Sequence, residues 1–362
     1  MKKVSFVKVN NFSAGPAILP QEVFEEASQA VLDFKGMGLS ILEISHRSKE
    51  FEEVMDEARS LASELLGIPD THEVLFLQGG ASSQFLMTAI NLLGENETAG
   101  YVDTGSWSAK AIKEAKLFGN VAVLASSKES NYSFIPKGYA IPGDLKYVHI
   151  TSNNTIFGTQ YHGLPETELP LIADMSSDIF SREVDVNRFG VIYAGAQKNM
   201  GPAGATLVIV NKEFVANPVR EVPTMLNYNT HIGKGSMFNT PPVFAVYVSM
   251  LTMKWIKSNG GVNAMAKRNR EKASLLYQAI HDSSLFRGPV MKEDRSDMNV
   301  VFLINNEDLT SSFLEACTAA GCSGVKGHRS VGGFRASIYN AMDISGVQTL
   351  VDVMKEFERV NG

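Results

Sequence analysis

A lysine among small residues is the strongest candidate for chemistry in this chain. Lys198 follows the apolar segment 191–194 and precedes a Gly-Pro-Ala-Gly turn at 201–204, after which a second apolar segment, 205–210, begins. A lysine at the mouth of a buried strand can have a lowered pKa and form a Schiff base with a carbonyl compound. Taken alone, Lys198 is more often a solvated loop residue, because an ammonium group is strongly hydrated.

A carboxylate occupies the end of another apolar segment. Asp174 follows residues 171–173, so a lysine and an aspartate are expected at the ends of neighbouring strands. Pyridoxal phosphate (PLP) requires such a pair, because an amine binds its aldehyde and a carboxylate faces its ring nitrogen. A helix N-cap or a turn former is the other interpretation of Asp174. Together with the glycines around Lys198, the pair favours a PLP site.

Two further segments could complete such a site. Residues 77–83 combine a strand end, the turn Gly79-Gly80 and a helix start, where backbone N–H groups and the helix dipole favour an anion such as phosphate. An ordinary tight turn would have the same sequence. Trp107 comes shortly after a strand that ends at Asp103, so its indole could stack on an aromatic ring. A core tryptophan is the alternative there.

Four cationic side chains lie in short motifs rich in glycine and serine and could bind an anionic substrate. They are Arg47, His328, Arg329 and Arg335. Arginine binds phosphate and carboxylate groups through paired hydrogen bonds, and histidine titrates near neutral pH. Each of the four residues, taken alone, is more often a surface charge.

The elements that must position these residues alternate between short apolar strands and longer amphipathic helices, which is typical of an α/β protein. Helices are expected at 52–66, from the 79–80 turn to about 93, and at 108–118. Strands are expected at 73–77, 101–103, 121–124, 147–150, 171–173, 191–194 and 205–210. Their apolar character suits a mostly parallel sheet that is covered on both faces.

The pattern changes after Pro241-Pro242. Two long helices are expected at 243–257 and 262–282, separated by the breaker Ser258-Asn259-Gly260-Gly261. A smaller α+β unit follows, with strands near 298–304 and 334–338, a helix near 311–320 and a closing helix from about 346. We therefore predict a large domain over residues 15–265 and a small C-terminal domain over 266–362, with residues 1–14 packing near the small one.

Composition narrows the class of protein. The chain has 362 residues, 44% hydrophobic and 20% charged, with a net charge of −6. This charge gives no general attraction to nucleic acid or an anionic membrane, and no stretch approaches a transmembrane span. The two cysteines, Cys317 and Cys322, are too few for a disulfide framework, and no cluster has metal-site spacing. With no apolar leader in residues 1–7, we expect a cytoplasmic protein.

Several long motifs resemble those of the phosphoserine aminotransferase family. Agreement extends from about residue 10 to the C-terminus and includes the segments 11–17, 45–51, 195–204, 236–242 and 326–340. The resemblance implies the aspartate-aminotransferase-like fold, which is fold type I of the PLP-dependent transferases, with a seven-stranded sheet in the large domain. It also implies a homodimer that transfers an amino group from L-glutamate to 3-phosphohydroxypyruvate in serine biosynthesis. A phosphorylated hydroxythreonine of pyridoxine biosynthesis is implied as a second substrate for bacterial members.

The resemblance also assigns roles to single residues. Lys198 would hold PLP covalently and later move a proton between the substrate and the cofactor. The implied cofactor contacts are Ala81, Ser82, Trp107, Thr155, Asp174 and Gln197, together with Asn239 and Thr240, which would reach the phosphate in the neighbouring subunit. Arg335 would bind the α-carboxylate, and Arg47, His328 and Arg329 the substrate phosphate. Ser82 departs from family members that carry arginine there, so its loop would depend on backbone donors and a hydroxyl group.

Other functions stay open at this point. A serine–glyoxylate type aminotransferase or a cysteine desulfurase would use the same cofactor. A desulfurase needs a reactive cysteine on a mobile loop, and only Cys322, expected just after a helix, keeps that option open. A PLP-binding protein without catalysis is the rival from another class, although Lys198, Asp174 and Trp107 are all present.

Overall fold

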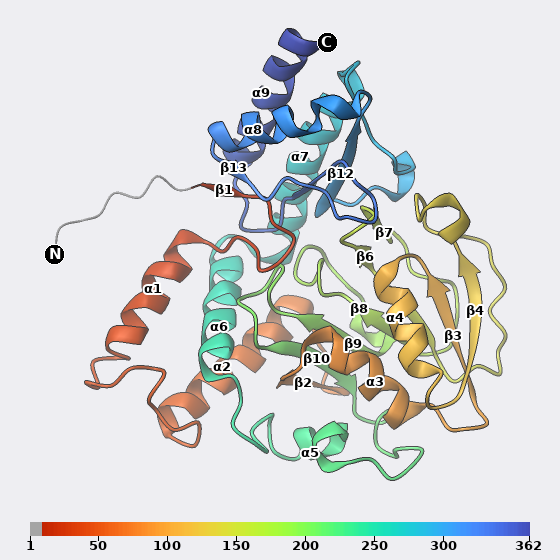
Figure 1. Cartoon of the computed structure of the whole chain (residues 1–362). Coiled ribbons are helices and arrows are strands. Elements are labelled where there is room, and N and C mark those ends of the chain that lie inside the picture. The colour runs from red at the N-terminus through yellow and green to blue at the C-terminus, as the bar shows by residue number, and fades with distance from the viewer. Residues whose placement is uncertain (1–8) are drawn as a thin grey trace.

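The computed structural model describes residues 9–362, and its centre is a seven-stranded sheet (Figure 1). The strands run in the order β2-β10-β9-β8-β5-β3-β4, and β10 alone runs antiparallel to its neighbours. Their bounds are His72–Leu77 for β2, Thr98–Asp103 for β3, Asn120–Ser126 for β4, Val148–Thr151 for β5, Leu171–Asp174 for β8, Phe189–Gly195 for β9 and Thr206–Asn211 for β10. The prediction of a mostly parallel sheet of seven strands is confirmed.

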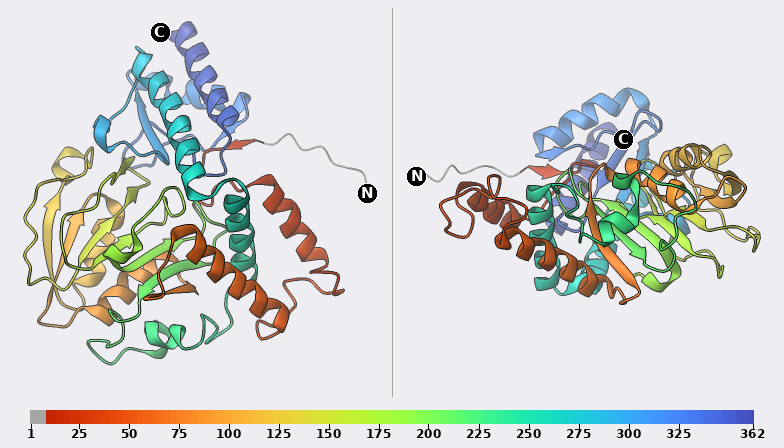
Figure 2. Two further views of the ribbon diagram at one scale, coloured as in Figure 1. Left: turned by 180° about the vertical axis from the view of Figure 1, so that it is seen from behind. Right: turned by 90° about the horizontal axis from the view of Figure 1, so that it is seen from below.

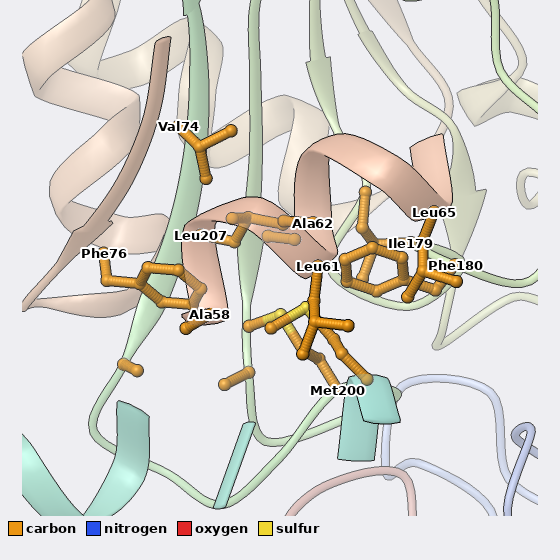
Figure 3. Packing of buried hydrophobic residues seen from close by; sticks show 14 of the residues in the cluster. Ala58, Leu61, Ala62, Leu65, Val74, Phe76, Ile179, Phe180, Met200 and Leu207 are labelled. Carbon is orange, nitrogen blue, oxygen red and sulfur yellow. The ribbon is translucent and has the colours of Figure 1, made fainter. Parts of the chain in front are cut away.

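Helices cover both faces of this sheet. One layer consists of α1 (Gln21–Leu32), α2 (Lys49–Leu66) and α6 (Val243–Ser258), and the other contains α3 (Gly80–Leu92) and α4 (Ser106–Ala115). Figure 3 shows how the buried stripe of α2, which includes Leu61 and Leu65, meets side chains of the sheet and of the following loops. This helix ends at Gly67, whose φ of 61° lies in the left-handed region that glycine adopts readily.

The smaller part of the molecule lies above the large sheet in the view of Figure 1. It contains an antiparallel sheet β11-β12-β14, whose strands span Phe286–Arg287, Asn299–Ile304 and Phe334–Ser337. Around it lie α7 (Gly261–Asp282), α8 (Thr310–Ala319) and α9 (Ile344–Asn361). Figure 2 shows α6 and α7 following one another from the large sheet to the small one. The predicted boundary at residue 265 falls inside α7, and the division into domains stays a prediction.

The chain near the N-terminus pairs with the C-terminal part. Strand β1 (Asn10–Asn11) runs parallel to β13 (Cys322–Ser323), and Phe12 is buried among side chains of the small sheet. Residues 1–8, which belong to the segment expected near the small domain, lie outside the described residues.

Some elements were not predicted from the sequence. They are α1, the short helix α5 (Tyr228–Ile232), the hairpin β6 (Asn153–Asn154) and β7 (Thr159–Gln160), the strands β1, β11 and β13, and five 3-10 turns at Lys128–Ser130, Val186–Arg188, Thr224–Leu226, Lys292–Asp294 and Glu307–Leu309. Most are too short to show a hydrophobic period. Among the described residues, no helix is both long and apolar enough to cross a membrane.

Candidate active site

The candidate site lies at one edge of the large sheet, where parallel strands end. Asp174 is the last residue of β8, and Lys198 follows the end of β9 at Gly195. The segments after β2 and β3 lead into α3 and into α4, which carries Trp107 in its first turn. In open α/β sheets, ligands bind beyond the carboxyl ends of the strands. The topology therefore gathers the predicted residues at the edge where chemistry is expected.

The amine of Lys198 is held by a single hydroxyl group. Its Nζ donates to Oγ1 of Thr155 at 2.7 Å and lies 5.3 Å from the centre of the Trp107 ring. Removal from water lowers the pKa of Lys198 to about 8; the charge of Asp174 opposes this shift and that of Arg335 reinforces it. A substantial fraction of the amine is therefore unprotonated near pH 8, as a nucleophile or proton carrier requires.

Gly15 approaches the lysine closely from the N-terminal segment. A Cβ atom at Gly15 would lie 3.2 Å from Cγ of Lys198 and 3.3 Å from the carbonyl oxygen of Gln197. The same carbonyl accepts a hydrogen bond from the backbone N–H of Ala17 at 3.0 Å. The segment 11–17, recognised in the sequence only as a motif, therefore forms one wall beside Lys198.

Asp174 is almost completely buried, with 4% of its surface exposed. Its Oδ1 accepts two hydrogen bonds from Ser176, one from the backbone N–H at 2.9 Å and one from the hydroxyl group at 2.6 Å. Burial raises the pKa of this carboxyl group, and the nearby cation Lys198 and the Ser176 donors oppose the rise. Within residues 9–362 no hydrogen bond engages Oδ2, so this oxygen is available to a cationic N–H partner.

The turn before α3 has the form expected of an anion site. Gly79 has a φ of 89°, and a Cβ atom there would collide with the side chain of Ser83. No side chain caps α3 and no acidic residue lies in its first turn. The free N–H groups around Ala81 and Ser82 therefore produce a positive potential at the start of this helix. The Ser82 side chain is exposed and forms no hydrogen bond within the described chain.

Two lysines lie close to the ring of Trp107. Its ring centre is 4.4 Å from Nζ of Lys110, one helical turn further along α4, and 5.3 Å from Nζ of Lys198. The indole Nε1 is buried and has no hydrogen-bond partner among residues 9–362. Lys110 was not singled out from the sequence, because an exposed lysine on a helix gives no signal without its neighbours in space.

Arg335 and the loop before it bring the cations of the small sheet to this edge. Arg335 lies on β14, its Nη1 donates to the backbone carbonyl of Thr155 at 3.3 Å, and its Nε has no partner in the described structure. Partial burial and the charges of Arg335, Arg329 and Lys110 lower the pKa of His328. The imidazole Nδ1 lies 2.7 Å from the Ser330 hydroxyl group.

Three predicted site residues make no contact with Lys198 within the described part of one chain, although two of them lie beside the turn before α3. Arg47 is exposed in the loop before α2, and only its backbone N–H has a hydrogen bond, to Ser45 at 3.2 Å. Thr240 is exposed, Asn239 is half-buried, and the carbonyl of Thr240 accepts a hydrogen bond from the Gln78 side chain at 2.8 Å. Within one chain, the described structure does not join these side chains to Lys198.

Comparison with known proteins defines the class. The sequence matches the family described as "Aminotransferase class-V" over residues 9–350. It is 61% identical to a phosphoserine aminotransferase of Flavobacterium johnsoniae over 353 residues, which cover 97% of this chain and 99% of that protein.

Solved structures agree with this match. A phosphoserine aminotransferase of Bacillus circulans subsp. alkalophilus superposes with a TM-score of 0.96 at 48% identity, covering 98% of this chain and 99% of the other. A PLP-bound phosphoserine aminotransferase of Trichomonas vaginalis gives 0.92 at 36% identity, covering 96% and 100%. The chain belongs to the phosphoserine aminotransferase family of the class-V aminotransferases, so it is a transaminase of fold type I whose cofactor is pyridoxal phosphate.

The residues present fit this cofactor. A lysine with a lowered pKa, a buried carboxylate with a free oxygen, an indole beside the lysine and an uncapped helix start all face one edge of the sheet. These are the groups that an aldehyde, a ring nitrogen, an aromatic face and a phosphate need. Among the described residues, no group of three His, Cys, Asp or Glu side chains is placed to hold a metal ion.

Proposed function

We propose that this transaminase exchanges an amino group between L-glutamate and 3-phosphohydroxypyruvate, giving O-phospho-L-serine and 2-oxoglutarate, in serine biosynthesis. The observation that carries the proposal is a group of cations next to Lys198. The charge of Arg335 acts on both Lys198 and His328, and Arg329 also acts on His328. Such a group suits the keto acid and its product, since both carry a phosphate and a carboxylate. The phosphorylated hydroxythreonine of pyridoxine biosynthesis carries the same two anions and is proposed as a second substrate.

The positions described above support the following cofactor contacts. Bound PLP supplies an electron sink for the electrons of the substrate Cα–H bond. Asp174 would face the ring nitrogen through its free Oδ2, and Trp107 would orient the ring by contact with its face. The start of α3 at Ala81 and Ser82, with Gln197 beside the lysine, would hold the phosphate.

Lys198 and Thr155 would carry out the proton transfer. The unprotonated Nζ of Lys198 would accept the proton of the substrate Cα and would later release it to the carbon that was the cofactor's aldehyde. Thr155 lies at hydrogen-bonding distance, so its hydroxyl group holds the amine in place during both steps. A pKa of about 8 suits a group that must accept and release a proton near neutral pH.

Substrate binding would depend on the small sheet. The free Nε of Arg335, with its second terminal nitrogen, can bind the α-carboxylate while Nη1 stays on Thr155. Arg329 and His328 would bind the phosphate of the longer substrate. Glutamate would use Arg335 for its α-carboxylate and the same cations for its side-chain carboxylate.

A homodimer with shared active sites would bring the three remaining residues into use. Exposed apolar side chains gather on α1 and the loop after it, between 39% and 72% exposed: Phe24, Leu32, Met37, Leu39 and Leu42. Phe238, next to Asn239, is also exposed. Such a surface favours burial against a second copy. Arg47, Asn239 and Thr240 would then serve the site of the neighbouring subunit.

Complementation tests the shared site. Lys198→Ala and Arg47→Ala variants are each expected to be impaired. A mixed dimer would regain activity, because one of its sites would combine an intact Lys198 with an intact Arg47 from the other chain. If mixing the two variants restores nothing, Arg47 does not act across subunits.

The reaction itself is tested by two half-reactions. Glutamate should convert the visible absorbance of the PLP-loaded protein to that of the pyridoxamine form, and 3-phosphohydroxypyruvate should restore it. Lys198→Ala should abolish both changes. A spectrum that ignores glutamate but responds to another amino donor would overturn the proposed donor. Return of the band with glyoxylate but not with the phosphorylated keto acid would favour a serine–glyoxylate type instead.

The cysteine desulfurase alternative has less support. Cys322 is buried in β13, and burial raises the pKa of its thiol to about 11, so it lacks the thiolate that a desulfurase needs. Both Cys317 and Cys322 are free, which suits a reducing compartment and our expectation of a cytoplasmic protein.

A further inference from the structure

Lys272 is a buried lysine that the proposed chemistry does not use. It lies on α7 with 2% of its surface exposed. Its Nζ donates to the backbone carbonyls of Ile338 at 2.8 Å and Tyr339 at 2.6 Å. A buried lysine usually has an acidic partner, and here two carbonyl groups take that place. The side chain therefore fixes the backbone just after β14.

The segment that Lys272 fixes contacts the large part of the molecule. The backbone N–H of Asn340 donates to Oδ1 of Asn199 at 2.9 Å, and its side-chain amide donates to the carbonyl of Phe180 at 2.9 Å. Asn269, one turn before Lys272 on α7, donates to Oδ1 of Asn340 at 2.7 Å. Every one of these groups is buried, so each lost hydrogen bond would leave an unsatisfied polar atom.

Asn199 links this hydrogen-bond network to Lys198. It directly follows Lys198, and its side-chain amide donates to the carbonyl of Ile179 at 2.6 Å. The backbone of the lysine segment is therefore tied both to the loop after β8 and to Asn340.

The segment that Lys272 fixes directly follows the strand that carries Arg335. Arg335 lies on β14, which ends at Ser337, immediately before Ile338. Its Nη1 donates to the carbonyl of Thr155, and the hydroxyl group of Thr155 holds Nζ of Lys198. Two routes thus connect Lys198 and Arg335. One runs through Thr155, and the other runs through Asn199, Asn340 and the backbone carbonyls that Lys272 binds.

We propose that Lys272 is a positioning residue for transamination, which sets the distance between the Lys198 amine and the Arg335 guanidinium through the path Ile338–Asn340–Asn199. Because a carboxylate on Arg335 fixes the place of the substrate Cα, this distance decides whether the Lys198 amine can reach the Cα proton. Displacement of a reacting group by about 1 Å can reduce a rate about a hundredfold. The proposal goes beyond the proposed substrates, since any amino donor with an α-carboxylate would depend on the same distance.

The charge of Lys272 is consistent with this role. Burial, reinforced by Arg268 and opposed by Asp343, lowers the pKa of Lys272 to about 7. The neutral amine has two N–H donors and the ammonium has three, so both forms can satisfy the two carbonyl groups.

Three variants test the path. Lys272→Met removes both donors and keeps an unbranched side chain, and Asn199→Ala removes the acceptor for Asn340. Lys267→Met, an exposed lysine on the same helix, is the matched control. Each is assayed in the glutamate half-reaction with the PLP-loaded enzyme, and the pH midpoint of its visible absorbance and the exchange rate of the Asn340 amide hydrogen are measured. Thermal unfolding of each variant is recorded alongside.

We expect Lys272→Met and Asn199→Ala each to reduce kcat/KM for glutamate about tenfold to a hundredfold, to shift the absorbance midpoint and to speed exchange at Asn340. The double variant should lose no more than the worse single one, because both act on one path. Lys267→Met should match the unchanged protein. Destabilisation alone would lower the unfolding midpoint and the active fraction, and would leave the KM and the absorbance midpoint in place.

The proposal is overturned if Lys272→Met keeps its half-reaction rate and absorbance midpoint, or if the losses multiply in the double variant. Should Lys272→Met fail to fold, Asn199→Ala decides: faster exchange at Asn340 with a shifted midpoint supports the path, and an unchanged half-reaction refutes it. A general failure to use glutamate is a different result, because the unchanged protein would then fail as well.

Discussion

Thr155 holds Lys198 by a hydrogen bond of 2.7 Å between its hydroxyl oxygen and the lysine Nζ, and its backbone carbonyl accepts from Arg335 at 3.3 Å. One residue of the loop after β6 therefore touches both the amine of Lys198, which we propose to be catalytic, and the cation expected to bind the substrate carboxylate. The hydroxyl group can be removed without disturbing the carbonyl, so the two contacts can be separated by substitution.

Thr155→Val keeps the shape of the side chain and removes the hydroxyl group. We expect kcat for the glutamate half-reaction to fall about tenfold, the loss of roughly one hydrogen bond to a reacting group, with a smaller change in KM because Arg335 keeps its carbonyl partner. Stopped-flow absorbance measures both constants. Thr252→Val is the control, because the hydroxyl group of Thr252 bonds only within its own helix, to Val248. Equal losses in the two variants would argue against a role for the Thr155 hydroxyl group.

The lowered pKa of Lys198 predicts how fast the apoenzyme captures PLP at each pH. Only the unprotonated amine attacks an aldehyde, so the rate should rise with pH through a midpoint near 8. Arg335→Met removes a like charge and should move this midpoint up, whereas Asp174→Asn removes an opposite charge and should move it down. Rapid-mixing fluorescence follows the capture. Midpoints that move in the same direction in both variants would contradict the electrostatic account.

The sequence predicted the large sheet well because six of its seven strands are almost wholly buried, and only the edge strand β4 is partly exposed. Each of the seven apolar runs became a strand, since a continuous apolar stretch bounded by turn residues suits that position. The glycine turn at Gly79-Gly80 and the glycines after Lys198 marked where the strands give way to functional loops. The pairing of β1 with β13 escaped prediction, since two residues carry no period.

The candidate site was predicted less completely than the fold. Lys198 and Asp174 stood out because polar residues follow apolar strands directly. Lys110, Gly15 and Lys272 did not, because their roles depend on neighbours that lie far away in the sequence. The proposed action of Arg47, Asn239 and Thr240 across subunits depends on a second chain, and a single sequence does not contain that geometry.

His328 predicts a pH dependence that belongs to the phosphorylated substrate. Partial burial and the neighbouring cations Arg335, Arg329 and Lys110 lower the pKa of His328, so the free enzyme holds it neutral at and above neutral pH. A phosphate dianion favours the protonated ring, and binding must then take up a proton, which becomes harder as pH rises. KM for 3-phosphohydroxypyruvate should therefore increase with pH. His328→Gln should flatten this increase and leave the α-carboxylate contact of glutamate at Arg335 in place. A slope unchanged in His328→Gln would assign the titration to another group.

Gly79 should tolerate no side chain. Its φ of 89° strains any other residue, and a Cβ atom would also collide with Ser83 in the first turn of α3. We expect Gly79→Ala to weaken PLP binding at least tenfold, because the N–H groups of that turn must shift. Gly138→Ala, at a φ of 69° with no atom close to the added Cβ, isolates the backbone strain of about 1–2 kcal/mol. Fluorescence titration with PLP and thermal unfolding distinguish the two. Retained PLP affinity in Gly79→Ala would remove the α3 turn from the phosphate site.

Lys110 is expected to contribute to recognition of the substrate phosphate. It lies over the Trp107 ring at 4.4 Å, and it is one of the cations that lower the pKa of His328, so its charge reaches the proposed phosphate site. Because the side chain is exposed, the effect should be modest: Lys110→Ala should raise KM for 3-phosphohydroxypyruvate about twofold to fivefold at low salt, and less at high salt. Lys113→Ala, on the same helix, is the matched control and should change KM little. If Lys110→Ala instead changes kcat equally at low and high salt, the lysine acts through the orientation of Trp107. Salt screens a long-range charge effect, but it does not reverse the displacement of a ring.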